Sequence, residues 1–332
     1  MSKADVVAII LVAGAALYAI FGGADFGAGL WQLLSRFDSD EGRRDRVRMR
    51  ISHSLGPVWE ANHVWLIFTL VVLWTAFPRG FAPIMETVYL PLALAVLGIV
   101  LRGSGFAFGH VLEGAAGRRS TEVFAISSVI TPFFMGCVVG AIAAGEVEAG
   151  GSGDALGWIG PLPIAVGALF VVACAYLACV FLLDDCRRAG DGELAAYFQR
   201  RAVATAVLAG AIALAGLVVL RADARYVFDG LLGEALPFVI ASLLLGAVTL
   251  AGLVRGWSRT LRPLAVGAVA MVIAGWAVAQ FPYLLPETLT VKEAAATDPT
   301  LTAVIVVFGF ALAIVGPSLA LLFRLAQRQA LE

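Results

Sequence analysis

Nine apolar runs, most of them about 20 residues long, constrain this chain more than any other feature of its sequence. A run of that length is what an α-helix needs to cross the hydrocarbon core of a bilayer. The rest of the chain could not cover a soluble protein, because 61% of the 332 residues are hydrophobic and only 14% are charged. The sequence therefore predicts an all-α, polytopic membrane protein that forms a single integral membrane domain over residues 1–332. The predicted spans are 5–34, 57–77, 81–101, 122–145, 161–183, 201–220, 236–254, 263–281 and 301–323.

The distribution of positive charge predicts the orientation of these spans. Of the 23 lysine and arginine residues, 18 lie after odd-numbered spans or in the C-terminal segment. Such residues collect on the cytoplasmic side, so we expect the N-terminus outside and the C-terminus in the cytoplasm. The acidic connections 146–160 and 282–300 are interpreted as solvated outer loops, with Pro282 ending the eighth span. The N-terminal run could also be a signal peptide, but apolar character resumes beyond Asp25, which favours an uncleaved span.

The second predicted span opens with polar residues in the stretch Gly56-Pro57-Val58-Trp59-Glu60-Ala61-Asn62-His63-Val64-Trp65-Leu66. At about 100° per residue, four of these side chains share one arc of roughly 160°: Trp59, Glu60, Asn62 and His63. A carboxylate inside a membrane span is costly and usually faces a bundle interior or a wet path, so Glu60 is a candidate functional residue. Trp59, Asn62 and His63 are candidates for contacting a cofactor.

Asp25 is the second carboxylate inside a predicted span. It lies within Gly22-Gly23-Ala24-Asp25-Phe26-Gly27-Ala28-Gly29, where small residues let a neighbouring helix come close. Asp25 is either a proton carrier or an anchor that hydrogen-bonds one helix to another, and we favour the first. Asp25, Glu60 and Arg102, which is expected to close the third span, gather toward the cytoplasmic side. They predict a proton-uptake path from that side, with a structural ion pair at the membrane edge as the alternative.

The histidines and cysteines have no metal-binding spacing, so we expect no metal site. Glu60-x-x-His63 has the spacing of di-iron carboxylate bundles, but no second copy is present. His63 as a haem ligand remains an alternative, although the three histidines form no recognisable facing pair: His53, His63 and His110. The cysteines form no CxxC and are expected to be packing residues: Cys137, Cys174, Cys179 and Cys186. No nucleotide-binding or nucleophile motif and no basic tract occurs, which argues against soluble substrates and nucleic acid.

The stretch from Gly56 to Leu66, followed by Trp74-Thr75-Ala76-Phe77-Pro78, resembles subunit II of cytochrome bd-type quinol oxidases. Weaker similarities follow the same order along nearly the whole chain: Asp25-Phe26-Gly27, Arg102-Gly103 with Phe106 and Phe108, and Phe281-Pro282-Tyr283 with Pro286. The run Trp-Glu-Ala-Asn-His-Val-Trp is the specific part of this resemblance.

The resemblance implies nine spans arranged as two four-helix bundles plus a peripheral helix, in a bacterial inner (plasma) membrane. It implies a heterodimer with a haem-bearing subunit I, which holds haems b and d and oxidises quinol while reducing oxygen to water. Subunit II itself is then expected to bind no haem, to contribute the proton path through Asp25, Glu60 and Arg102, and to hold a structural quinone or lipid. Small accessory subunits are further possible partners. One departure concerns Gly22, because family members often carry an earlier acid in an Asp-Gly-Phe-Asp run.

Two other functions are compatible with carboxylates inside spans. One is a proton-coupled secondary transporter, which often shows paired broken helices in two halves of the chain, and here only the first span has a Gly-rich break. The other is a purely structural assembly subunit, in which Asp25 and Glu60 only hold helices together. A haem spectrum of the protein purified with its partners would separate these functions.

Overall fold

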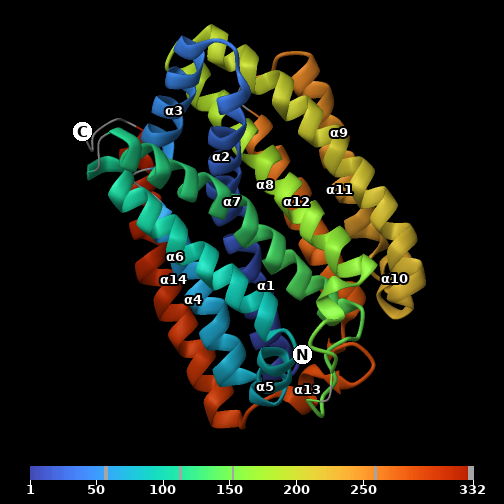
Figure 1. Cartoon of the computed structure of the whole chain (residues 1–332). Helices are drawn as coiled ribbons and strands as arrows, with labels where there is room; N and C mark the ends of the chain where they lie inside the picture. The colour runs from blue at the N-terminus through green and yellow to red at the C-terminus, as the bar shows by residue number, and fades with distance from the viewer. Residues whose placement is uncertain (56–58, 112–113, 152, 258–259, 328–332) are drawn as a thin grey trace.

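The computed structural model describes residues 1–55, 59–111, 114–151, 153–257 and 260–327 (Figure 1). Within these residues, eight helices are long and apolar enough to cross a membrane, and a bent helix pair supplies a ninth span. This confirms the prediction of an all-helical protein with about nine spans.

The first span consists of helical pieces in line. A π-helical turn, η1 (Tyr18–Gly22), joins α1 (Lys3–Leu17) to α2 (Gly23–Leu34). The 3-10 turn η2 (Ser35–Phe37) then leads to the charged helix α3 (Glu41–Leu55). α3 is not among the predicted elements, because it has few apolar residues and is not a membrane span.

The boundary between the second and third spans differs from the prediction. α4 (Trp59–Ala76) is followed by the separate helix α5 (Pro78–Thr87), which turns away by 119°. Phe77 breaks the helix with φ −131° and ψ 55°, and Pro78 then begins the next one. The third span therefore starts only at α6 (Tyr89–Val111), and the predicted span 81–101 is wrong at both ends.

The remaining elements place the other six spans close to their predicted positions, and α12 ends just before Pro282 as predicted. They follow in this order: α7 (Gly114–Ala143), η3 (Gly157–Ile159), α8 (Pro161–Arg188), α9 (Gly192–Asp223), α10 (Arg225–Leu232), α11 (Leu236–Val254), α12 (Leu261–Gln280), β1 (Tyr283–Leu285), β2 (Leu289–Thr290), α13 (Val291–Ala294) and α14 (Asp298–Gln327). The two short strands pair as an antiparallel hairpin, which the sequence analysis expected only as a turn.

The helices group into two bundles and one outer helix. α8, α9, α11 and α12 close one bundle, because each packs on the next and α12 returns to α8. In the other bundle the first span packs against α4 and α7, and α7 packs against α6. α8 also packs on α2 and α7 and so joins the bundles, while α14 lies outside against α1 and α4 (Figure 1).

The two ends of the molecule differ in charge. α3, which carries five arginines, lies at one end, whereas the N-terminus, α5 and α13 lie at the other (Figure 1). Lys3 and Asp298 pair at 2.9 Å, so α1 and α14 begin at the same end and run in the same direction. This arrangement agrees with an odd number of spans.

Candidate functional site

A buried ion pair joins the first and third spans. Nη2 of Arg102 lies 2.6 Å from Oδ1 of Asp25, and both side chains are 1% exposed. The same nitrogen donates a hydrogen bond to the main-chain oxygen of Asp25 at 3.2 Å. The expectation that Arg102 closes the third span at the membrane edge is wrong, because α6 begins at Tyr89 and Arg102 lies well inside it. The structure thus brings two of the three predicted proton-path residues together in the interior.

The Arg102 guanidinium is surrounded by groups that compensate its charge. Nη1 donates a hydrogen bond to the hydroxyl of Ser128 on α7. The guanidinium carbon lies 5.0 Å from the ring centre of Phe26 and 4.3 Å from that of Phe124, and aromatic faces attract cations at such distances. A buried cation is tolerated only with a partner of opposite charge and further hydrogen bonds, and Arg102 has both.

Glycines on α2 bring this pair close to α7 and α8. An added Cβ on Gly27 would lie 1.9 Å from the carbonyl oxygen of Cys174, and one on Gly29 would lie 2.1 Å from the hydroxyl oxygen of Ser128. Any larger side chain at these two positions would therefore push the helices apart. The predicted close helix approach around Asp25 is confirmed.

The π-helical turn lies directly before this segment. Asn62 on α4 is 4% exposed, and its Nδ2 donates a hydrogen bond to the carbonyl oxygen of Phe21 at 3.3 Å. π-helical turns are frequent at functional sites, because they disturb the regular ladder of backbone hydrogen bonds. Asn62 therefore fixes α4 against the irregular part of the first span, one turn before Asp25.

His63 packs into an aromatic cluster beside the ion pair. Its ring centre lies 6.1 Å from that of Tyr18 and 6.3 Å from that of Phe26, and both contacts are edge-to-face. Tyr18 and Phe26 make a similar contact at 6.3 Å. The sequence-predicted candidates Asn62 and His63 thus both lie on α4 against the part of the first span from Tyr18 to Phe26.

Three polar atoms of this cluster stand out. Within the described part of the chain, Oδ2 of Asp25, the hydroxyl of Tyr18 and Nε of Arg102 are buried without a hydrogen-bond partner. Most buried polar atoms in proteins are paired, so unpaired ones call for a functional explanation. One carboxylate oxygen of Asp25 is held by Arg102, and the other can accept a proton without breaking that bond.

Glu60 and Trp59 lie in the first turn of α4, but their side chains fall outside the described residues, as do Pro57 and the side chains of His53 and His110. How close Glu60 lies to the ion pair therefore stays a prediction.

The charged residues before α4 are held in place by ion pairs. The guanidinium of Arg43 lies 2.5 Å from the carboxylate of Asp38 and holds the pKa of that carboxyl well below its usual range. A hydrogen bond to Glu193 raises the pKa of Arg46 and links α3 to the start of α9. These contacts fix α3 at the end of the bundle from which α4 enters.

Among the described residues, no group of three His, Cys, Asp or Glu side chains gathers as candidate metal ligands. The described cysteines are buried and unpaired by disulfides. Haem iron needs an axial ligand such as His, and the rings of Tyr18 and Phe26 lie edge-to-face against His63.

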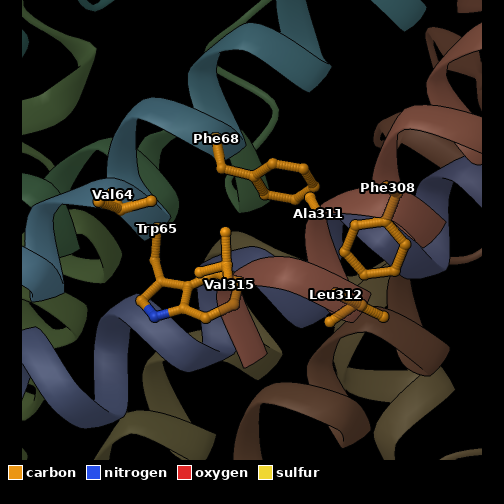
Figure 2. A pocket seen from close by; sticks show the side chains of 7 residues that line it. All are labelled: Val64, Trp65, Phe68, Phe308, Ala311, Leu312 and Val315. Atoms are coloured by element: carbon orange, nitrogen blue, oxygen red, sulfur yellow. The ribbon is translucent and has the colours of Figure 1, made fainter. Parts of the chain in front are cut away.

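An apolar hollow lies between α4 and α14 (Figure 2). Its volume is about 40 Å³, and its lining side chains are Val64, Trp65, Phe68, Phe308, Ala311, Leu312 and Val315. A hollow of this size and chemistry suits part of a hydrocarbon chain, such as a lipid tail or a quinone tail, rather than a polar ring.

The candidate site residues predicted from the sequence do not include Tyr18, Ser128 or Phe124. Ser127-Ser128 is a pair of hydroxyls inside an apolar span, and that signal could have marked α7 as a partner of a buried charge. Tyr18 precedes Gly22 by one turn, but a tyrosine in an apolar run is usually only a packing residue.

Comparisons with known proteins agree with one another. A family model described as cytochrome bd terminal oxidase subunit II matches residues 4–326. Subunit 2 of the cytochrome bd ubiquinol oxidase of Bacillus subtilis (strain 168) is 30% identical over 115 residues, which are 34% of this chain and 32% of that protein. Subunit 2 of the cytochrome bd-I ubiquinol oxidase of Escherichia coli (strain K12) is 29% identical over 130 residues, 39% of this chain and 32% of that protein.

The matched stretches thus span about a third of the length of these two relatives. The structure of bd oxidase from Geobacillus thermodenitrificans contains a chain similar over almost its full length. The TM-score is 0.75 and the sequence identity 25%, with 98% of each chain covered.

Proposed function

The chain belongs to the cytochrome bd terminal oxidase subunit II family, and we propose that it is the haem-free subunit of a membrane-bound quinol oxidase. It would pair with a haem-bearing subunit I and reduce oxygen to water only in that complex. The family match across nearly the whole chain carries this proposal. Its support from the fold is the architecture of eight long apolar helices and one bent helix pair among the described residues.

The proposed orientation has the N-terminus outside and the C-terminus in the cytoplasm of a bacterial cell. The arginine-rich α3 lies at the end opposite the N-terminus, as positive residues on the cytoplasmic side require (Figure 1). The N-terminal ends of α1 and α14 would then face outward together with α13.

The role proposed for this chain in the reaction is to take up protons from the cytoplasm. Glu60 lies at the start of α4, close in sequence to α3, and would receive the proton first. Asp25 would hold it next on Oδ2, while Arg102 keeps Oδ1 in place through the 2.6 Å ion pair. Arg102 is a positioning residue here, because it acts through the carboxylate. When bound in subunit I, the haems supply the electron transfer to oxygen that consumes these protons.

The geometry of Asp25 is also compatible with the structural alternative. A buried ion pair with Ser128, Phe26 and Phe124 around its cation holds α2, α6 and α7 together whether or not protons pass. The free carboxylate oxygen favours the proton path, because an anchor alone would gain from a second hydrogen bond at that atom.

A secondary transporter receives less support. Such proteins often place broken helices at matching positions of two halves. The π-helical turn interrupts the first span, and the described part of the second bundle has no corresponding π-helical turn in α8, α9, α11 or α12.

Lipid or quinone would contact this chain at the apolar hollow between α4 and α14 (Figure 2). The hollow could hold a segment of an isoprenoid or acyl chain as a structural element. Small accessory subunits would bind elsewhere on the apolar surface of the complex.

Glu60→Gln and Asp25→Asn test the proton path in the assembled complex. Each should slow quinol-dependent oxygen consumption while leaving haem content normal, because each removes a proton-binding group and keeps its shape. Glu234→Gln, an exposed change at the end of the bundle near the N-terminus, is the matched control and should behave like wild type. Loss of the haem-bearing partner in the first two variants would instead support the structural role.

The same preparation tests the partner. Protein purified from its host should carry a haem spectrum, and the chain expressed alone should be colourless and inactive. A stoichiometric haem spectrum from the chain alone would contradict the proposal.

A further inference from the structure

We propose that Tyr18 is a further proton-relay residue, whose hydroxyl takes a proton from the Asp25 carboxyl through a water molecule and passes its own proton onward to water. The phenol is neutral before and after this step, because one proton arrives at Oη as another leaves. This inference rests on the proton path proposed above and adds a residue to it.

The direction of the Tyr18 side chain is the first observation. An added Cβ on Gly22 would lie 2.9 Å from Cε2 of Tyr18 and 3.5 Å from Cζ, so the Tyr18 ring packs directly against Gly22 on the same face of the first span. Gly22 is three residues before Asp25, which is about 4.5 Å of helix rise. The Tyr18 ring centre also lies 6.3 Å from that of Phe26, whose ring lies against the Arg102 guanidinium, so Tyr18 borders the ion pair. In the proposed relay, one water molecule lies between the Tyr18 hydroxyl and the Asp25 carboxyl.

The hydroxyl itself is the second observation. Tyr18 is 5% exposed, and its oxygen has no hydrogen-bond partner among the described residues. A phenylalanine would make the same ring contacts with Phe26 and His63 without burying a polar atom. Oδ2 of Asp25 is a second buried oxygen without a partner among the described residues, so the same cluster holds two such atoms.

The third observation is that Gly22 has no side chain. Any Cβ there would collide with the Tyr18 ring, so the glycine is what leaves room for the ring at this place. Tyr18 and Gly22 are the two ends of the π-helical turn, and Asn62 holds that turn through Phe21. Relay hydroxyls need such a fixed position, since a hydroxyl both donates and accepts.

The charged and titratable groups around Tyr18 come from four elements. Asp25 lies on α2, His63 on α4, Arg102 on α6 and Cys174 on α8. The Asp25–Arg102 pair is neutral while the carboxyl is ionised and carries one positive charge once Oδ2 is protonated, and that charge favours passing the proton on.

Tyr18→Phe in the assembled oxidase tests the relay. Oxygen consumption should fall on the order of tenfold or more, as for loss of a proton-transfer group, with haem content unchanged. Because proton delivery then limits the rate, the rate should rise as the pH falls, and the ratio of rates in H2O and D2O should increase. A hydroxyl used only for packing would leave both the pH profile and the isotope ratio unchanged.

Two further variants sharpen the test. Gly22→Ala should slow oxygen consumption in the same direction, because it displaces the Tyr18 ring without removing any titratable group. Tyr176→Phe is the matched control, since Tyr176 is a buried tyrosine on α8 whose hydroxyl hydrogen-bonds to Thr249, and it should keep the wild-type rate.

The outcomes separate this inference from the proposed function. If Asp25→Asn slows oxygen consumption and Tyr18→Phe does not, the relay is refuted and the proton path stands. If Asp25→Asn leaves the rate unchanged, the proton path itself is refuted and the relay with it. Should Tyr18→Phe assemble without haem, the Gly22→Ala rate and isotope ratio decide, and wild-type values there refute the relay.

Discussion

Replacing Arg102 by methionine measures how strongly the buried ion pair holds the bundle together. Methionine replaces the unbranched arginine stem by an apolar side chain of about the same length as that stem and removes the guanidinium with its charge. The N–O distance is 2.6 Å, and charge centres about 4 Å apart attract by about 4 kcal/mol at the effective dielectric constant typical of protein sites. Removing one partner of a buried pair typically costs about 3–5 kcal/mol, because the other charge is left alone. We therefore expect Arg102→Met to destabilise the protein by about 4 kcal/mol.

The double variant Asp25→Asn with Arg102→Met separates charge from packing. With both charges gone, no ion is left uncompensated, so the loss should fall to about 1–2 kcal/mol. Arg225→Met is the matched control. It breaks the Arg225–Asp229 pair, whose side chains are 65% and 57% exposed, and such surface pairs contribute under about 1 kcal/mol.

The assay is the thermal unfolding midpoint of the purified protein in detergent at one fixed heating rate, since such unfolding is often irreversible. At roughly 2–4 °C per kcal/mol, Arg102→Met should lower the midpoint by on the order of 10 °C. The reasoning is refuted if Arg102→Met stays within about 1 kcal/mol of wild type, or if the double variant is no more stable than the single one.

Three further predictions follow from other parts of the chain. A reporter at the C-terminus should be active only in the cytoplasm and one near Asp154 only outside, and the opposite activity at either site would contradict the topology. Gly27→Ala should lower the unfolding midpoint by several degrees, because its Cβ would lie 1.9 Å from the carbonyl oxygen of Cys174. Gly216→Ala, with open space around it, should match wild type. Hydrogen bonds from the capping threonine of α13 hold the pKa of Glu293 below its usual value. The resulting stabilisation is present above the ordinary Glu pKa of about 4.3 and is lost as the pH falls through the lowered value. Hydrogen-exchange protection of α13 should therefore drop in acid, and constant protection would refute this assignment.

Hydrophobic run length predicted the spans well, because crossing a bilayer imposes length and apolarity on each helix. It failed at α5, whose residues Pro78–Thr87 are apolar enough to extend the apparent third span backward. The bend between α4 and α5 depends on the backbone conformation of Phe77 and on the packing of α5 against α13. Neither can be deduced from the length of a hydrophobic run. Because the third span begins at Tyr89, Arg102 lies deeper than the sequence suggested.

The candidate site was predictable in its charged members and not in its neutral ones. A carboxylate or guanidinium inside an apolar run is conspicuous, which is why Asp25 and Arg102 were found and correctly placed in one cluster. Tyr18, Phe124 and Ser128 are ordinary residues of apolar helices, and only their contacts mark them. The π-helical turn has no recognisable single-sequence signal beyond Gly22-Gly23.

The ion pair also has a consequence for how the chain is made. Asp25 and Arg102 are 77 residues apart, so Asp25 emerges from the ribosome about 4–15 s before its cation at ordinary synthesis rates of roughly 5–20 residues per second. During that interval the first helix enters the membrane with a lone carboxyl, which costs about 2.5–3.5 kcal/mol on insertion scales. The long apolar sequence on both sides of Asp25 in this helix offsets the cost. Early insertion of the first helix therefore depends on its own apolar residues, and its final packing between α7 and α8 forms only after α8 has been synthesised.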